Sequence, residues 1–268
     1  MIMTCDELNL RKIDGDTMKK PKRSSAQYRA AIKLAEEDLR VGAKILEYEM
    51  GDIWGHVGVR LPEDEGIAVQ MFRRPESGKK DWLVHFDYEL NKLGGVGTPP
   101  REAAIYTGIF KARPDVNAAV HSHAPMCVAL SLADKAVSCV QMQSDRFGRG
   151  VPIYPKPIYI LDDAEGTDLA RTLDQAVAVT IKGHGIVTVG KTIDEACMCA
   201  LRMERAAKIM AMAQLFGFKE VSDEFIEQLS ESKEKLFSRQ RSKMTHSADW
   251  NYYADMIRKG KVWTRGWT

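Results

Sequence analysis

Short β-branched runs alternate with amphipathic segments between residues 56 and 217, and this alternation restricts the fold more than any other feature. The first three runs, at 56–60, 66–72 and 82–87, are joined only by turn-rich segments such as PEDE and PESGKK. Parallel strands need a crossover of about a dozen residues or more, whereas antiparallel strands can follow a short turn. These runs therefore predict an antiparallel meander. The whole pattern predicts one layered α/β domain with a mixed or antiparallel sheet.

The remaining elements follow from apolar spacing and cap residues. Ser24 and Ser25 are cap candidates for a helix that ends at Gly51, and Thr192 precedes a long helix that ends at Gly217. The segment AVAVTIKGHGIVTVG predicts two strands that are broken at 183–185. Further helices are predicted in REAAIYTGIFKA after Pro100, in APMCVALSLA, at 164–175 and from Ser222 to about residue 236. Further strands are predicted in AAVHSH and AVSCVQM.

The two ends of the chain differ from this central region in composition. Residues 1–23 are polar and lysine-rich without periodicity, which predicts an N-terminal arm outside the packed domain. Residues 24–243 contain all the predicted elements, and residues 244–268 form a tail rich in tryptophan and tyrosine. A chain of 268 residues is long enough to bury a large core without disulfides.

Charge and cysteine content exclude several classes of protein. The chain has 39 basic and 37 acidic residues, and a net charge of +2 predicts neither a nucleic-acid groove nor an anionic-membrane binder. No apolar run approaches the roughly 18 residues of a membrane span, and the first residues lack the basic and then apolar pattern of a signal peptide. The five cysteines are scattered and odd in number, so we expect reduced core thiols in a cytoplasmic protein.

Three of the six histidines have a spacing typical of metal ligands. His121 and His123 lie at i and i+2 at the end of a predicted strand, so both side chains project from one face. His184 lies between two predicted strands, where flanking glycines allow a close approach. Three neutral imidazoles from neighbouring strands would form an open site for a divalent ion. Zinc suits three nitrogen ligands best, and manganese, iron or cobalt are compatible. An H-x-H pair alone also fits histidines that are merely hydrogen-bonded.

Longer motifs around these residues resemble the class II aldolase/adducin family. They are PPRE, which contains Glu102, then RPDVNAAVHSHAP, and then IKGHGIVTVGKTIDEA. The intervals also agree with those of fuculose-phosphate aldolase, since 121 − 102 = 19 and 184 − 121 = 63. The resemblance extends from about residue 25 to residue 217, which is most of the chain.

The resemblance implies a fold, an assembly and a set of site residues. The implied fold is a three-layer α/β/α sandwich with a mixed, mainly antiparallel central sheet, in a homotetramer with active sites at subunit interfaces. His121, His123 and His184 are implied to bind the metal, and Glu102 is implied to be an acid/base that also approaches the ion. A bound divalent ion stabilises the negative charge left when a carbon–carbon bond breaks, and a nearby carboxylate can move the proton. Aldol cleavage and decarboxylation share this chemistry.

The sequence departs from the sugar-phosphate members where those members bind phosphate. They resemble S-G-N-x-S-x-R where this chain has WGHVGVR, so His56 takes the asparagine position, and two serines stand where this chain has Pro100 and Arg101. Hydroxyl and amide groups suit phosphate oxygens, whereas an arginine fork suits a carboxylate. Met142 stands where fuculose-phosphate aldolase has its proton-donating tyrosine. A sugar phosphate is therefore not the expected substrate.

His56 and Arg101 are similar to residues of family members that decarboxylate hydroxylated aromatic acids, such as dihydroxyphthalate decarboxylase and the pyridine-dicarboxylate decarboxylase of vitamin B6 breakdown. We therefore predict a metal-dependent decarboxylase of a hydroxylated aromatic or heteroaromatic acid. Glu102 or His56 would supply the proton, and Arg101 would bind the carboxylate. Tyr252 and Tyr253 are further substrate-binding candidates if the tail folds over a neighbouring subunit's pocket, and packing on its own subunit is the alternative.

Three other functions are compatible with the same motifs. The first is a retro-aldol lyase that releases a small aldehyde from a non-phosphorylated substrate. The second is an iron-dependent oxygenase built on this fold. The third is an interaction module without chemistry, like the head domain of adducin. Retention of Glu102 and the three histidines argues against the module, because a binding module does not require metal-seeking side chains.

Overall fold

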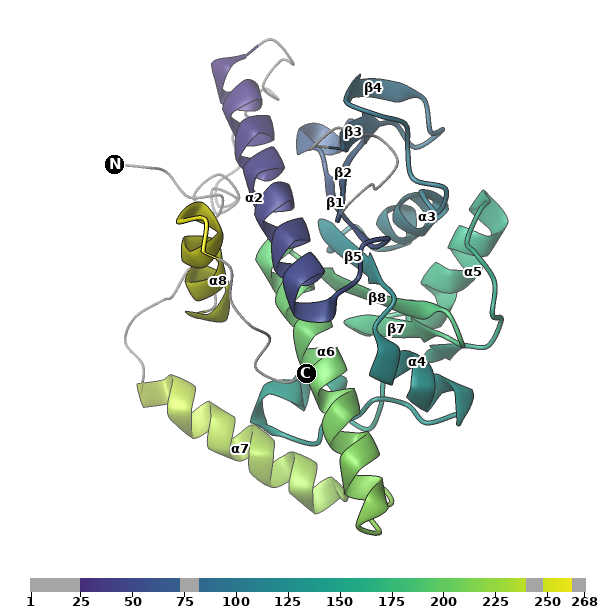
Figure 1. The fold of residues 1–268 in the computed structure, drawn as a ribbon, viewed down its shortest axis with the longest axis vertical. Coiled ribbons are helices and arrows are strands. Elements are labelled where there is room, and N and C mark those ends of the chain that lie inside the picture. Colours follow the sequence, from purple (N-terminus) through teal and green to yellow (C-terminus); the bar gives the residue numbers. More distant parts are fainter. Residues whose placement is uncertain (1–24, 73–81, 240–247, 262–268) are drawn as a thin grey trace, which may run out of the picture.

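The computed structural model describes residues 25–72, 82–239 and 248–261 (Figure 1). Eight strands form one sheet in the order β4-β3-β2-β1-β5-β8-β7-β6. They are β1 (His56–Arg60), β2 (Ile67–Met71), β3 (Leu83–Phe86), β4 (Lys92–Gly95), β5 (Ala118–Ser122), β6 (Ile153–Tyr154), β7 (Ala178–Ile181) and β8 (Gly185–Gly190). The β6–β7 pair is parallel and the other neighbouring pairs are antiparallel. The predicted mixed, mainly antiparallel sheet is therefore confirmed.

Helices cover both faces of this sheet. They are α2 (Ala26–Met50), α3 (Ala104–Ala112), α4 (Pro125–Leu132), α5 (Asp163–Leu173), α6 (Ile193–Leu215), α7 (Asp223–Arg239) and α8 (Ala248–Arg258), with two short 3₁₀ helices, η1 (Pro62–Asp64) and η2 (Met142–Phe147). The helices α2, α4, α6 and α8 share one buried cluster with the sheet, and α3 and α5 share the other. This arrangement is the expected three-layer α/β/α sandwich.

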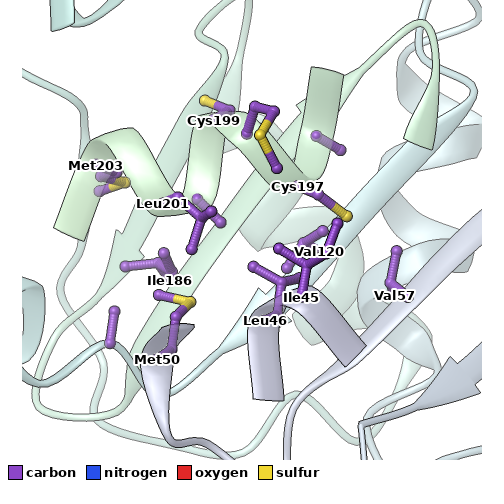
Figure 2. Close-up of a cluster of buried hydrophobic side chains, with 14 of the residues drawn as sticks. Ile45, Leu46, Met50, Val57, Val120, Ile186, Cys197, Cys199, Leu201 and Met203 are labelled. Atoms are coloured by element: carbon purple, nitrogen blue, oxygen red, sulfur yellow. The ribbon is translucent and has the colours of Figure 1, made fainter. Parts of the chain in front are cut away.

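Alternation along the strands divides the core into these two clusters. Val57 and Val120 face α2 and α6, whereas Ala119 faces α3 and α5. Figure 2 shows the first cluster, in which Ile45 and Leu46 of α2 lie near Val120 of the sheet. The side chains that point the other way along these two strands face α3 instead. They include His56 on β1 and His121 on β5.

Most strands and α-helices follow the sequence pattern, but one predicted strand is wrong, and two strands and one α-helix were missed. Ser25 and Thr192 cap α2 and α6 as predicted, since each side chain accepts a backbone N–H of the first turn. The strand predicted in AVSCVQM is wrong. Cys139 donates its N–H to Gly148, and Val137 accepts one from Val151, so this segment is a loop bonded to the loop that follows η2. The strands β4 and β6 and the helix α8 were not predicted.

Several expectations concern the ends of the chain, the membrane and the cysteines. The predicted arm, residues 1–23, lies outside the described residues, as do Cys5 and residues 262–268 of the aromatic tail. None of the described helices is both long and apolar enough to cross a bilayer. Cys127, Cys139, Cys197 and Cys199 are buried free thiols, as expected for core positions.

Candidate metal centre

Glu102, His121, His123 and His184 come together at one side of the sheet. Each offers one ligand atom, and these atoms all lie within 4.8 Å of one another. The ring centroids of the three histidines are 4.9 to 5.4 Å apart. His121 lies on β5, His123 directly follows it, His184 lies in the turn between β7 and β8, and Glu102 lies just before α3. Three segments of the chain thus meet at one point.

Local backbone geometry explains the position of His184. Gly183 has φ +67°, the left-handed conformation that suits the tight turn between β7 and β8. A Cβ on Gly185 would lie 2.6 Å from the carbonyl oxygen of Ser122. The two glycines that flank His184 therefore serve the turn and the close packing of β8 on β5.

The Nδ1 atom of each histidine is held by an acceptor, which fixes the ring orientation. Nδ1 of His121 donates to the carbonyl of Ile186 at 3.1 Å, and Nδ1 of His184 donates to the carbonyl of Ile158 at 2.8 Å. Nδ1 of His123 lies 3.2 Å from Oδ2 of Asp52. A histidine whose Nδ1–H is donated in this way keeps a free lone pair on Nε2 when neutral.

The Nε2 atoms of two of these histidines have no comparable partner. Those of His121 and His184 lie 3.4 and 3.6 Å from Oε2 of Glu102. Both are buried without a hydrogen bond to any described residue. Buried polar atoms normally find a partner, so these two lone pairs and the adjacent carboxylate fit a divalent cation. Three imidazole nitrogens with one carboxylate oxygen are a donor set that zinc and other divalent transition metals accept.

Burial and mutual contacts shift the titration of these residues. Burial alone would raise the pKa of Glu102, but His121, His184 and the N–H of Ile160 outweigh it and hold this pKa well below its ordinary range. Burial lowers the pKa of His121 despite Glu102. For His184 the burial is smaller, so contact with Glu102 raises the pKa above its ordinary value. The carboxylate is therefore ionised at neutral pH.

These shifts predict that metal affinity rises with pH. His184 must lose its proton to offer Nε2, and its raised pKa means that protons already compete near neutrality. Below that pKa the affinity should fall by up to about tenfold per pH unit for each proton released. Zinc affinity measured by competition between pH 6 and pH 8 checks this, and an affinity that is constant over this range would contradict it.

Asp52, which the sequence did not single out, organises the loop before β1 and orients His123. Its Oδ1 accepts the N–H groups of Trp54 and Gly55, and its Oδ2 accepts the N–H of His123 at 2.8 Å. Burial would raise the pKa of Asp52, but the bonds to His123 hold it well below its ordinary range. In the sequence, an aspartate after a helix-ending glycine looks like an ordinary turn residue. Only the tertiary contact with His123 distinguishes Asp52 from other turn aspartates.

Replacing Asp52 with asparagine should weaken metal binding about 10- to 100-fold, because partners that orient metal-ligating histidines have effects of this size. Competition titration with a zinc chelator measures the change. Asp115→Asn is a matched control, since Asp115 pairs with Arg113 outside the cluster. If both variants bind zinc like the unmodified protein, Asp52 does not orient His123 for metal binding.

Two further candidate residues, His56 and Arg101, differ in their burial and contacts. His56 on β1 is buried opposite His121 in the sheet register, with ring centroids 5.1 Å apart. Burial, with a smaller contribution from His121, lowers the pKa of His56 to about 3, so its ring is neutral. Arg101 precedes Glu102 and is exposed, with no ion pair or hydrogen bond to the described residues. Its predicted role in binding a carboxylate remains a prediction.

The two tyrosines of the tail are not brought into the cluster. Tyr252 and Tyr253 lie on α8, which packs on α2 and α6, whereas Glu102 comes from the α3 side of the sheet. The hydroxyl of Tyr253 accepts a hydrogen bond from Arg205 at 2.9 Å, and Tyr252 is 60% exposed. Contact of either tyrosine with substrate remains a prediction that requires a neighbouring subunit.

Known proteins show the same sequence and fold features. Residues 45–211 match the family model described as the class II aldolase and adducin N-terminal domain. The chain is 25% identical over 169 residues to a 3,4-dihydroxyphthalate decarboxylase of Terrabacter sp. (strain DBF63). The aligned region covers 58% of this chain and 70% of that protein. It is 30% identical over 121 residues to an L-fuculose phosphate aldolase of Methanococcus vannielii, and that aligned region covers 45% of this chain and 65% of the aldolase.

A solved structure shows the same architecture. The L-fuculose 1-phosphate aldolase from Glaciozyma antarctica PI12 superposes with a TM-score of 0.69 over 92% of this chain and 97% of that chain. The sequences are 22% identical, so this similarity establishes a shared fold.

Proposed function

Since the chain belongs to the class II aldolase and adducin family, we propose that it is a metal-dependent carbon–carbon lyase. More specifically, we propose a decarboxylase of a hydroxylated aromatic or heteroaromatic carboxylic acid. The observation that carries the proposal is the geometry of the three histidines. Their Nδ1 atoms are held by Asp52, Ile158 and Ile186, and each offers a ligand atom within 4.8 Å of the others and of Glu102.

His121, His123 and His184 would hold the ion, with Glu102 at its side. When bound, a divalent ion such as zinc, manganese, iron or cobalt supplies Lewis-acid stabilisation of negative charge on substrate oxygens. The protein contributes a pre-oriented donor set, because the hydrogen bonds to Nδ1 are already made before any ligand arrives.

Glu102 would move the proton in this proposal. Its Oε1 accepts the N–H of Ile160 at 3.0 Å, which leaves Oε2 facing the histidines. An ionised Glu102 can take the proton of a substrate hydroxyl and deliver it to the ring carbon that carries the carboxylate. This protonation interrupts the aromatic ring. Carbon dioxide then leaves the same carbon, its bonding electrons restore the aromatic ring, and the products are the phenolate and carbon dioxide.

The substrate class is supported by the surroundings of the cluster. Arg101, exposed and unpaired among the described residues, adjoins Glu102 and can bind a carboxylate through a bidentate fork. His56 stands in the WGHVGVR segment where sugar-phosphate relatives resemble S-G-N-x-S-x-R. The relatives named as 3,4-dihydroxyphthalate decarboxylases act on an acid of this class and are about 25% identical to this chain.

The test is carbon dioxide release from a panel of ortho-hydroxylated benzoic, phthalic and pyridine carboxylic acids. We expect release that stops with a chelator and returns with added zinc or manganese. Metal-loaded protein that releases no carbon dioxide from any of these acids would contradict the decarboxylase.

A retro-aldol lyase is the second candidate, and the 30% identity to an L-fuculose phosphate aldolase favours it. The same four residues would serve it, with an aldehyde as the leaving fragment. Aldehyde trapped during turnover without carbon dioxide would identify this reaction, and oxygen uptake would identify an oxygenase instead.

We also propose a homotetramer whose sites are completed at subunit interfaces. Large apolar side chains next to the cluster are exposed in the single chain, including Tyr159, whose ring lies 5.3 Å from that of His184. Trp54 and Leu161 are also more than half exposed. Light scattering during size-exclusion chromatography should give about four times the mass of 30.1 kDa, and a monomer would contradict this assembly.

A further inference from the structure

The hydroxyl of Tyr106 forms two hydrogen bonds to one residue beside the candidate metal centre. It donates to the carbonyl oxygen of His56 at 3.0 Å, and it lies 2.7 Å from Nδ1 of the same histidine. A phenol has a single proton to donate, and a carbonyl oxygen can only accept. Both contacts are satisfied together only when Nδ1 of His56 carries a proton and donates it to the hydroxyl oxygen.

The surrounding structure holds Tyr106 in this place. Its side chain is fully buried and its ring lies over Gly58, where a Cβ would be 2.4 Å from the ring atom Cε1. Gly58 and His56 point to the same side of β1, two residues apart. Tyr106 also lies in the first turn of α3, four residues after Glu102, and the carbonyl of Glu102 accepts the N–H of Ile105 in the turn that leads into this helix. One segment therefore supplies both Glu102 and Tyr106.

The remaining ring nitrogen of His56, Nε2, is the one that the Tyr106 hydroxyl does not contact. Nε2 makes no hydrogen bond with the described part of the chain, and the His56 ring lies beside His121. With the proton on Nδ1, a neutral His56 presents only a lone pair at Nε2. It can accept a hydrogen bond there but cannot donate one.

We propose that Tyr106 is a positioning residue that fixes this tautomer of His56, so that Nε2 accepts a hydrogen bond from a hydroxyl of the substrate bound at the cluster. This inference rests on the proposed function. It makes His56 a determinant of specificity for hydroxylated substrates, because an analogue without that hydroxyl leaves the lone pair unpaired. In this role His56 does not supply the proton to the substrate, so Glu102 does.

The tautomer can be measured directly by NMR of zinc-loaded protein labelled with ¹⁵N-histidine. The chain has six histidines, and the His56 signals are those missing from His56→Asn. We expect the proton of His56 on Nδ1 in the unmodified protein and a shift of population toward Nε2–H in Tyr106→Phe. A proton on Nε2 in the unmodified protein, or an unchanged tautomer in Tyr106→Phe, would overturn the proposal.

Tyr154→Phe is the matched control, because Tyr154 is equally buried and its hydroxyl contacts Asp168 rather than His56. It should leave the His56 tautomer unchanged. If it shifts the tautomer as much as Tyr106→Phe does, the hydroxyl of Tyr106 has no specific role.

The acceptor role is tested with two probes, 2,3-dihydroxybenzoate and salicylate, which lacks the second hydroxyl. Unmodified zinc-loaded protein should prefer the dihydroxy acid, and Tyr106→Phe should reduce that preference about five- to tenfold, as expected for one hydrogen bond. Equal weakening for both probes would overturn the acceptor role. The tautomer measurement needs no turnover, so a protein that fails to release carbon dioxide would refute the proposed function and leave this test standing.

Discussion

Replacing His184 with alanine should abolish tight metal binding and turnover together. His184 is the ligand candidate that comes from the β7–β8 turn, whereas His121 and His123 come from one segment. Without it, two imidazoles and a carboxylate remain, and the zinc affinity should fall roughly a hundredfold or more. Turnover should fall by at least about a thousandfold, because the Lewis acid is lost. Metal content after dialysis and carbon dioxide release measure the two effects.

The control for this variant is His85→Ala. His85 is a histidine outside the cluster, and its Nε2 lies 3.1 Å from Glu36. It should keep both metal and activity. Because His184 is only partly buried, its removal should leave a folded protein, which thermal unfolding can verify. Full zinc occupancy in His184→Ala would show that the cluster is not the metal site.

Replacing Glu102 with glutamine should separate metal binding from proton transfer. The amide oxygen can still accept the N–H of Ile160, so the side chain should keep its position. The amide cannot take or return a proton, and loss of an acid/base group of this kind lowers kcat about 10²- to 10⁴-fold. The zinc affinity should change less, because the three histidines remain. Turnover should therefore be expressed per bound metal ion.

Glu204→Gln is the matched control for this substitution. Glu204 is also a buried carboxylate, but it accepts the N–H groups of Met126 and Cys127 at the start of α4. An amide oxygen can accept at least one of these bonds, so this variant should keep kcat. If metal-loaded Glu102→Gln turns over at the unmodified rate, another group moves the proton.

Local sequence rules predicted most helices and strands. They failed where pairing with another segment decides whether a strand forms. The strand β4 contains Lys92, Leu93 and two glycines, which have little strand propensity, and it forms by pairing with β3. β6 has two residues between prolines, which restricts it to the edge of the sheet. In the opposite sense, AVSCVQM looks like a strand, but its backbone groups bond to a nearby loop.

The helix α8 is a similar case. The many aromatic residues of the tail indicated that it packs against something, but not whether against its own subunit or a neighbouring one. In the structure Trp250 and Tyr253 join the same buried cluster as α2 and α6. Burial of apolar area against these helices stabilises α8, a helix too short to be stable alone in water.

The sequence by itself predicted the layered fold and the three histidines of the cluster, and the resemblance of its motifs to a known family added Glu102. Strand alternation, cap residues and motif spacing act over a few residues, so they can be read along the chain. Tertiary structure decided how these residues are oriented, because Asp52, Tyr106 and the carbonyls of Ile158 and Ile186 reach the histidines from 26 to 71 positions away. The direction of a hydrogen bond depends on where two distant segments meet in space, and no local pattern specifies that meeting.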